Sequence, residues 1–185
     1  MLDELLSELN LRMQKAVDGL AREFAGIRAG RATPALLENI TVDYHGSPVP
    51  LYQLATMSVP EANLIVVQPW DRTSLRDIER AILAANIGLN PANDGNVIRV
   101  VIPPLSEERR NELVKLVSRR VEERRIAIRN IRRDGIEQLR EMEKNKDISQ
   151  DELKSNTKKI DQLTEAFVDK VSELGGSKER EIREI

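Results

Sequence analysis

Residues 106–133 read SEERRNELVKLVSRRVEERRIAIRNIRR, and their apolar side chains recur at steps of three and four. This series consists of Val114, Val117, Val121, Ile128 and Ile131, and the aliphatic stem of Arg124 spans the one seven-residue step. Such spacing predicts a single apolar stripe along a long helix. Ser106 is placed to cap the helix, which could continue to about Lys146.

Two more segments show the same spacing, one on each side along the chain. The first has its apolar residues at Leu2, Leu5, Leu6, Leu9, Met13, Val17, Leu20, Phe24 and Ile27, and is expected to end near Gly30. The second begins at Ser149, which forms a capping box with Glu152, and continues through Leu153, Ile160, Leu163, Phe167, Val171 and Leu174. Gly175 and Gly176 are expected to end or interrupt it, leaving residues 177–185 as a candidate docking tail.

Between about Arg31 and Pro104 the pattern changes to short β-branched runs separated by Gly, Pro and Asn. Candidate strands are Ile40–Tyr44, Ala55–Val59, Leu64–Gln68 and Val97–Ile102, with turns at residues 45–48 and 93–96 and a helix capped by Asp71 or Thr73. Three amphipathic helices can bury their stripes only against one another. The predicted fold class is therefore α+β, with a small α+β domain (31–104) inserted into a long antiparallel three-helix bundle (1–30 and 105–185).

Bulk composition limits the function. The 185 residues include no cysteine, which excludes disulfides and thiolate metal sites and fits a reducing, cytoplasmic location. We expect neither a signal peptide nor a membrane span, because residues 1–10 are acidic and no run approaches about 20 apolar residues. Aromatic residues make up only 3%, which argues against an aromatic stacking platform for single-stranded nucleic acid.

Charge is segregated along the chain. Between residues 109 and 133, ten basic residues face three glutamates, a net charge of +7, so the rest of the chain carries −9 to reach the total of −2. Nine of the ten are arginine, whose planar fork suits bidentate phosphate contacts. With the apolar stripe facing the bundle, the outer side carries Lys115, Arg119, Arg129 and Arg133, and Arg132 borders it. This pattern favours a polyanion-binding face over a solvated surface with internal ion pairs such as Glu112 with Lys115.

Enzymatic and metal-binding patterns do not stand out. His45, the single histidine, lies in a Gly-Ser-Pro turn and is interpreted as a surface residue, and Asp43 as the solvent-facing member of a strand. We identify no phosphate loop, metal motif or cofactor motif in the sequence. Trp70 is interpreted as a packing residue rather than a base-stacking one. Met13, Met57 and Met142 are assigned to cores rather than to an exposed groove for a partner.

Four motifs resemble one known family. They read IRAGRATPALL (27–37), NIGLNP (86–91), IPPLSEERR (102–110) and RNIRRD (129–134). The chain is similar over essentially its whole length to the bacterial ribosome recycling factors. This resemblance implies a near-L-shaped, transfer-RNA-like outline and binding to large-subunit ribosomal RNA on the post-termination 70S ribosome. It also implies that elongation factor G then hydrolyses GTP and splits the subunits, after which initiation factor three keeps the small subunit free.

The resemblance also assigns residues. The RNA-contacting basic positions of the family match Arg28, Arg31, Arg110, Arg129, Arg132 and Arg133. Lys115 and Arg119 are added because they lie on the same outer side of the predicted helix. The two crossings between the domains predict hinges at Ala29, Gly30 and Arg31 and at Pro103, Pro104 and Leu105.

The sequence therefore predicts a monomeric translation factor with no active site and no cofactor of its own. Two other hypotheses remain. One is a self-associating coiled-coil adaptor, which sedimentation would find oligomeric. The other is a hydrolase that uses His45, which would lose its activity when His45 is removed.

Overall fold

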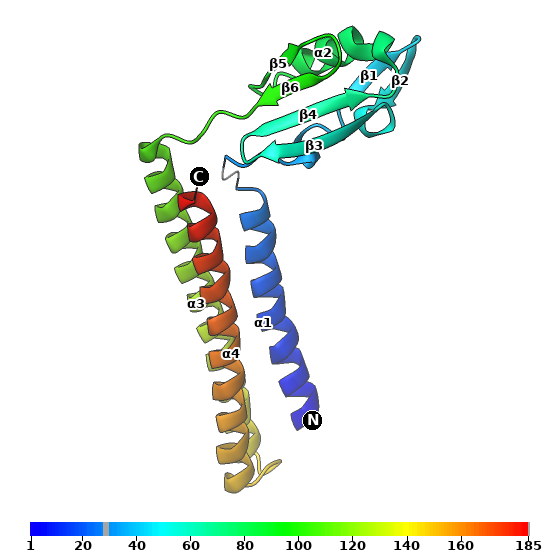
Figure 1. The fold of residues 1–185 in the computed structure, drawn as a ribbon. Helices are drawn as coiled ribbons and strands as arrows, with labels where there is room; N and C mark the ends of the chain where they lie inside the picture. Colours follow the sequence, from blue (N-terminus) through cyan, green and yellow to red (C-terminus); the bar gives the residue numbers. More distant parts are fainter. Residues whose placement is uncertain (28–29, 185) are drawn as a thin grey trace. The chain divides into compact units, whose positions relative to one another are not determined.

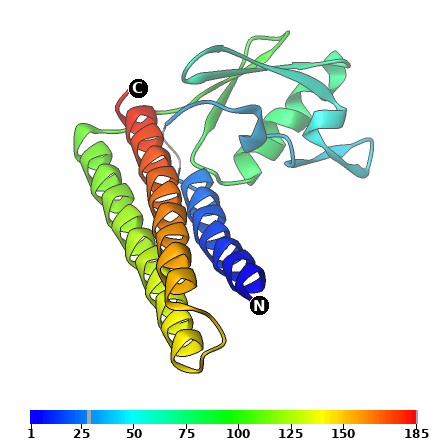
Figure 2. The same ribbon diagram turned by 90° about the horizontal axis from the view of Figure 1, so that it is seen from below.

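Three long helices, α1 (Leu2–Ala25), α3 (Glu107–Lys144) and α4 (Gln150–Arg183), lie side by side (Figure 1, Figure 2). In Figure 1, α3 runs antiparallel to α1 and α4. The computed structural model describes residues 1–27 and 30–184. The helices belong to one unit, residues 1–27 with 107–184, here called the helical unit, and residues 30–106 form the small unit. The predicted α+β class is confirmed.

The core of the helical unit follows the predicted stripes, with local differences. Its buried residues on α3 are Leu113, Val117, Val121, Ile128, Ile131, Gly135 and Leu139. Leu113 rather than Val114 begins this row, because Leu113 lies one turn before Val117 on the same face. On α4, Leu163 and Leu174 are only half-buried, and Asn156, Thr164 and Lys178 lie in the core row with Phe167 and Val171.

Two glycines allow the helices to approach closely. A Cβ atom added at Gly135 would lie 2.5 Å from Cδ1 of Leu9 on α1, and one added at Gly175 would lie 2.5 Å from Cγ2 of Val121 on α3. The expectation that Gly175 and Gly176 end or interrupt the third helix was wrong, because α4 continues through both to Arg183. At Gly175, the side chain of Val121 on α3 occupies the space that a side chain at this position would need.

The ends of the helices differ from the predicted ones by a few residues. α1 ends at Ala25 with Gly26 as its C-cap, not near Gly30, and the amide of Gly26 donates to the carbonyls of Arg22 and Glu23. Ser149 caps α4 as predicted, because its Oγ accepts a hydrogen bond from the amide of Glu152 at 3.1 Å.

The small unit is built on a four-stranded antiparallel sheet in the order β3 (Ala55–Glu61), β4 (Leu64–Pro69), β6 (Ile98–Val101), β5 (Asn90–Asn93). β1 (Thr41–Tyr44) and β2 (Ser47–Pro50) form a separate hairpin, closed by His45 and Gly46 at positive φ. Three short 3-10 segments (Pro34–Leu36, Leu51–Gln53 and Arg72–Ser74) and the helix α2 (Leu75–Ala84) complete the unit.

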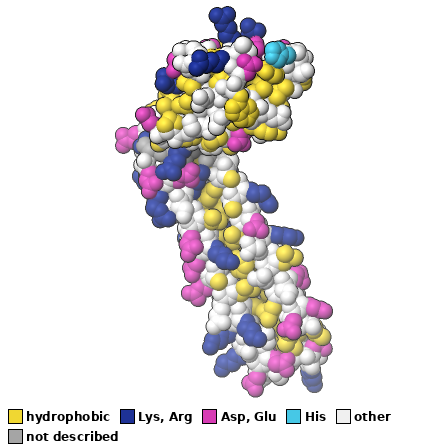
Figure 3. All heavy atoms as spheres, turned by 45° about the vertical axis from the view of Figure 1, so that its right-hand side comes forward, with side chains coloured by type: hydrophobic (Ala, Val, Ile, Leu, Met, Phe, Trp, Pro, Cys, Tyr) yellow, Lys and Arg dark blue, Asp and Glu magenta, His cyan; other side chains and the backbone are white. Residues whose placement is uncertain are grey.

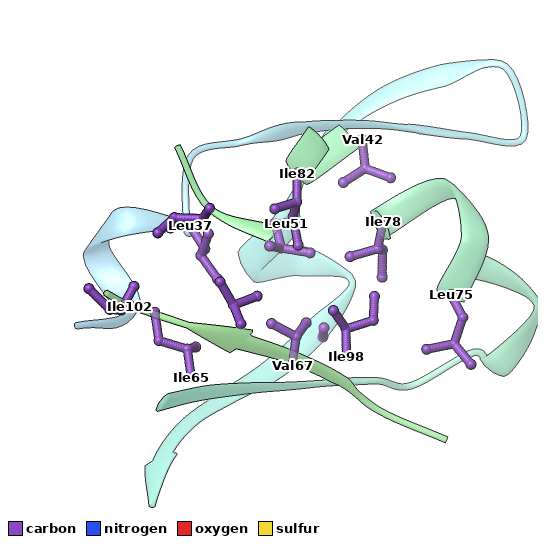
Figure 4. Packing of buried hydrophobic residues seen from close by; sticks show 13 residues of the cluster. Leu37, Val42, Leu51, Ile65, Val67, Leu75, Ile78, Ile82, Ile98 and Ile102 are labelled. Carbon is purple, nitrogen blue, oxygen red and sulfur yellow. The ribbon is translucent and has the colours of Figure 1, made fainter. Parts of the chain in front are cut away.

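Its core lies between the sheet and α2 (Figure 4). Ile65 and Val67 of β4 and Ile98 of β6 point to one face, where they meet Ile78 and Ile82 of α2. Val100 of β6 is buried in the same cluster. Other members are Val42 of the hairpin, Leu51 of a 3-10 segment and Leu37, which directly follows the first 3-10 segment. The period of two in the strands and the period of three to four in the helix therefore bury one continuous cluster.

β2 and β5 were not predicted from the sequence, because both contain proline. Pro48 and Pro50 lie in β2, and Pro91 lies in β5. Proline cannot donate a ladder hydrogen bond, so it occurs mainly in edge strands. β5 is an edge of its sheet, and β2 pairs only with β1.

Candidate nucleic-acid interface

The outer face of α3 carries the predicted basic residues. Lys115, Arg119, Arg129 and Arg133 are all exposed, and Arg132 is half-buried beside them. They lie here because the buried row from Leu113 to Leu139 fixes how the helix is rotated about its own axis. Lys115 and Arg133 are 18 residues apart, a distance of about 27 Å along a helix. This face is therefore long enough to meet several phosphates of one polyanion.

Several arginines of α3 are held by carboxylates of the other two helices, which the count of charges within α3 could not reveal. Arg124 Nη2 lies 2.6 Å from Glu23 of α1, and Arg120 Nε lies 3.9 Å from the same carboxylate. Arg132 Nε donates to Asp161 of α4 at 2.6 Å. These three arginines therefore link the helices of the unit and balance part of the +7 charge.

Within α3, glutamates form ion pairs with further arginines. Glu122 lies 3.3 Å from Arg125 and 3.9 Å from Arg129, and Glu112 lies 2.9 Å from Arg109. The suggested pair of Glu112 with Lys115 was therefore wrong. A hydrogen bond from Arg120 to Glu123 raises the pKa of that guanidinium, so Arg120 stays fully charged.

Three cations of the outer face remain without a carboxylate. Within residues 1–27 and 30–184, no ion pair is formed by Lys115, Arg119 or Arg133. Arg119 and Arg133 are two heptads apart, so they occupy nearly the same angular position on the helix. Ile126, which is 50% exposed, lies between them. The charge available to a ligand is therefore concentrated on this line of α3, which we call the basic face.

Arg110 has a different environment from the basic face. Its side chain is half-buried at the start of α3, and its Nε atom is buried with no hydrogen-bond partner among the described atoms. It lines a hollow of about 280 Å³ together with Glu107, Asn111 and Arg183. The structure does not bring Arg110 onto the line of Lys115, Arg119 and Arg133.

The predicted hinge segments lie in or next to the small unit. Gly30 has φ +78°, and a Cβ atom added there would lie 3.2 Å from Cγ of Leu105, so these two predicted hinge positions are neighbours. Arg31, Pro103 and Pro104 are exposed. Arg28, which was predicted to contact RNA, and Ala29, a predicted hinge residue, lie outside the described residues.

The other singled-out residues have varied outcomes. His45 is exposed at the hairpin turn, with its ring centroid 4.2 Å from that of Tyr44, and Asp43 is exposed, as both were predicted to be. Met13 and Met57 pack in the cores as predicted. The interpretation of Trp70 as a packing residue was wrong, because its side chain is 69% exposed.

In the described part of the chain, no group of His, Asp and Glu side chains is arranged to hold a metal ion, and no helix could span a membrane.

A second set of basic residues, which was not predicted from the sequence, lies in the small unit. Arg72, Arg76 and Arg80 are exposed and recur every fourth residue from the 3-10 turn into α2. The four-residue spacing is visible in the sequence, but arginine is less dense here than in α3. The surface in Figure 3 shows dark blue side chains standing out from the small unit, and interspersed basic and acidic ones along the visible face of the helical unit.

Comparison with known proteins gives consistent matches along the chain. A family model described as ribosome recycling factor matches residues 20–182. A ribosome-recycling factor of Geobacillus sp. (strain WCH70) is 49% identical over 185 residues, covering 100% of both chains. That of Bacillus licheniformis is 48% identical over 182 residues, covering 98% of each. That of Dehalococcoides mccartyi is 46% identical over 185 residues, covering 100% of both chains.

Solved structures agree with these matches. A solution structure of the ribosome recycling factor has a TM-score of 0.70 and 44% identity, covering 100% of this chain and 98% of its own. A second match, with a TM-score of 0.59 and 44% identity, covers 98% of both chains. Its description is of models for the T. thermophilus ribosome recycling factor and the E. coli elongation factor G bound to the E. coli post-termination complex.

Proposed function

The chain belongs to the ribosome recycling factor family, and from this premise we propose that it acts on the post-termination 70S ribosome. In the proposed reaction it binds the ribosome, and elongation factor G then binds and hydrolyses GTP. The ribosome separates into its subunits and releases the messenger RNA and the deacylated transfer RNA. The similar structure described as bound with elongation factor G to the post-termination complex supports this choice of partners.

The basic face of α3 is the proposed contact with large-subunit ribosomal RNA. The single observation that supports it is the line formed by Lys115, Arg119 and Arg133, which are exposed and form no ion pair with a described carboxylate. Cations that are not already neutralised gain the most from meeting phosphates, because no internal partner has to be displaced.

The remaining proposed RNA contacts have different surroundings and therefore different roles. Arg129 borders the basic face, 3.9 Å from Glu122. Arg132 is oriented by the bond from its Nε to Asp161, which leaves its two terminal nitrogens available for a phosphate. Arg110, with an unpartnered buried Nε, adds a contact at the start of α3. Arg28 and Arg31 are proposed from the family resemblance alone.

The two segments between the helical unit and the small unit are the proposed hinges. Gly30 has a backbone conformation that other residues rarely adopt, and it lies beside Leu105 of the returning segment. Ala29 and Arg31 flank Gly30 in the sequence, and Pro103 and Pro104 precede Leu105. A swing at these positions would let the small unit transmit force from elongation factor G.

The protein has no catalytic step in this proposal, because the GTP chemistry belongs to elongation factor G. We propose that the chain works as a monomer, which distinguishes it from a self-associating adaptor and is tested by sedimentation. Cytoplasmic ribosomes are its proposed site of action. Initiation factor three is proposed to follow it, by keeping the released small subunit free.

The experiment reverses charge on the basic face. Arg119→Glu with Arg133→Glu should weaken binding to 70S ribosomes by at least about a hundredfold, because each lost contact to a charged group contributes at least about tenfold. Splitting of post-termination ribosomes with elongation factor G and GTP, followed by light scattering, should fall in parallel. Raising the variant concentration should restore splitting, because the substitutions weaken binding and leave the later steps unchanged.

The matched control is Lys154→Glu with Lys158→Glu. These lysines are exposed on α4 and one turn apart. Two basic residues become acidic in both variants, so the change in net charge is the same. The control should bind ribosomes nearly as well as the unaltered chain. Equal binding by both variants would remove the proposed role of the basic face, and failure of the unaltered chain to split ribosomes would remove the proposed function.

A further inference from the structure

The small unit carries an exposed row of arginines that the proposed function does not use. Arg72 lies in the 3-10 turn before α2, and Arg76 and Arg80 follow on the helix. The buried residues Leu75, Ile78 and Ile82 fix the opposite side of α2 against the core. Arg76 and Arg80 therefore point away from the unit, and they are separated along the helix by about 6 Å.

These arginines are not neutralised within the described part of the protein. None of the three forms an ion pair there. The acidic residues of α2 lie toward its flanks, where Asp77 and Glu79 are half-buried and Glu79 accepts a hydrogen bond from Asn93. Residues 30–106 contain five arginines and no lysine, and three of the five lie within the short segment 72–80.

An aromatic side chain precedes the row. Trp70 is 69% exposed and lies two residues before Arg72. The residue between them, Asp71, is engaged by Tyr44 and Thr73, so its carboxylate does not bind the arginines. The exposed indole and the unpaired guanidinium groups are therefore available to a partner. Arginine with a stacking aromatic is the combination that recognises unpaired RNA bases and their phosphates.

We infer that Trp70, Arg72, Arg76 and Arg80 form a second RNA-binding surface, one that takes a single-stranded RNA segment. The guanidinium groups bind successive phosphates, and the indole stacks on one base. A single tryptophan suffices for one base, which is consistent with the low aromatic content that argues against a platform for several. The inference goes beyond the proposed function, which places the RNA contacts on α3 and at Arg28 and Arg31.

The test uses the full chain labelled with ¹⁵N and a single-stranded RNA of about ten nucleotides with mixed sequence. Nuclear magnetic resonance spectra should show shifts of the Trp70 indole N–H and of the α2 amides on titration. Arg76→Glu with Arg80→Glu should abolish those shifts and leave the shifts on α3 in place. The control Lys154→Glu with Lys158→Glu, also an exposed pair one turn apart, should keep both sets.

A second arm measures affinity for the same RNA against salt concentration. At the proposed surface, followed by the shift of the Trp70 indole N–H, the reversal of Arg76 and Arg80 should weaken binding by about tenfold or more and reduce the slope of log K against log salt by up to about two. Arg76→Lys with Arg80→Lys should keep most of the slope but lose part of the affinity, because lysine lacks the planar fork.

The absence of shifts at Trp70 and α2, at RNA concentrations that shift α3, would overturn the inference. Arg76→Glu with Arg80→Glu would also overturn the inference if it bound RNA normally but bound elongation factor G more weakly. The surface would then fit an acidic protein and not RNA. Failure of ribosome splitting would contradict the proposed function but would leave this titration unaffected. Circular dichroism and thermal unfolding check that each variant is folded.

Discussion

Gly175 and Gly176 are neighbours in α4, but their surroundings differ. Gly175 is buried against Val121, where an added Cβ atom would lie 2.5 Å from Cγ2. Gly176 is half-buried, and its added Cβ atom would meet only Nη1 of Arg180, at 3.6 Å. Val121 is β-branched and has one strongly preferred rotamer in a helix, so it cannot easily turn away.

The two alanine substitutions should therefore have opposite effects on stability. Gly175→Ala should lower the free energy of unfolding by about 1–3 kcal/mol, because the helices must separate or Val121 must leave its rotamer. Gly176→Ala should raise it by about 0.5–1 kcal/mol, because alanine loses less backbone entropy in a helix. Urea unfolding followed by far-ultraviolet circular dichroism measures both. If both alanine substitutions raised the free energy of unfolding, α3 and α4 would not be in close contact at Gly175.

At the scale of elements, one carboxylate joins the hairpin β1–β2 to the start of α2. Asp71 Oδ1 accepts hydrogen bonds from the hydroxyl and the amide of Thr73, at 2.7 Å and 3.0 Å, and Oδ2 accepts one from the hydroxyl of Tyr44 at 3.0 Å. The hydrogen bonds from Thr73, and then that from Tyr44, lower the pKa of Asp71. The hydrogen bond between Tyr44 and Asp71 also raises the pKa of the Tyr44 hydroxyl.

This lowered pKa gives the small unit a defined dependence on pH. A carboxyl group whose pKa is lowered by folding stabilises the folded state above its unfolded pKa of about 3.9, and this contribution is lost as the pH falls through the folded value. Asp71→Asn should therefore be less stable than the unaltered chain near pH 7 and should lose less stability on acidification. Urea unfolding monitored by the fluorescence of Trp70, the single tryptophan, measures this.

Asp43→Asn is the control for this prediction, because it removes an exposed carboxylate of the same hairpin and leaves the bond between Tyr44 and Asp71 in place. It should keep the pH dependence of the unaltered chain. Identical acid sensitivity of Asp71→Asn and the unaltered chain would contradict the role of Asp71.

The elements that could be predicted are those with a strong internal period. The three long helices and the strands β1, β3, β4 and β6 follow from the spacing of apolar residues, with ends displaced by a few positions. The bonds from Arg124 to Glu23 and from Arg132 to Asp161 could not be predicted, because they depend on how far each helix slides along its neighbour. Likewise, the exposure of Trp70 depends on tertiary packing, which the flanking sequence does not determine.

At the scale of the whole molecule, the proposed swing of the small unit depends on Gly30. Its φ of +78° suits glycine, and the side chain of Leu105 lies close by. Gly88 has φ +77°, but an added Cβ atom there would meet nothing within 4 Å. The two glycines have the same backbone conformation, and only Gly30 lies at a proposed hinge.

Gly30→Ala should therefore reduce the rate of ribosome splitting more than it reduces ribosome binding, because it restricts the hinge and leaves the basic face of α3 unchanged. Gly88→Ala introduces similar backbone strain, about 1–2 kcal/mol, but should split ribosomes normally. Pelleting with 70S ribosomes measures binding, and light scattering measures splitting. Equal losses of binding and splitting in Gly30→Ala, or equal effects of the two substitutions on splitting, would argue against a hinge at Gly30.

The proximity of Gly30 and Leu105 has a consequence for protein engineering. A segment whose two ends nearly touch can be removed from its host or exchanged for another, because a short linker closes the gap in the host chain. Residues 30–105 have this geometry and contain their own apolar cluster. The segment could be produced as an autonomous recombinant fragment, and chimaeras that graft the corresponding segment of a relative into this chain would separate the contribution of each part.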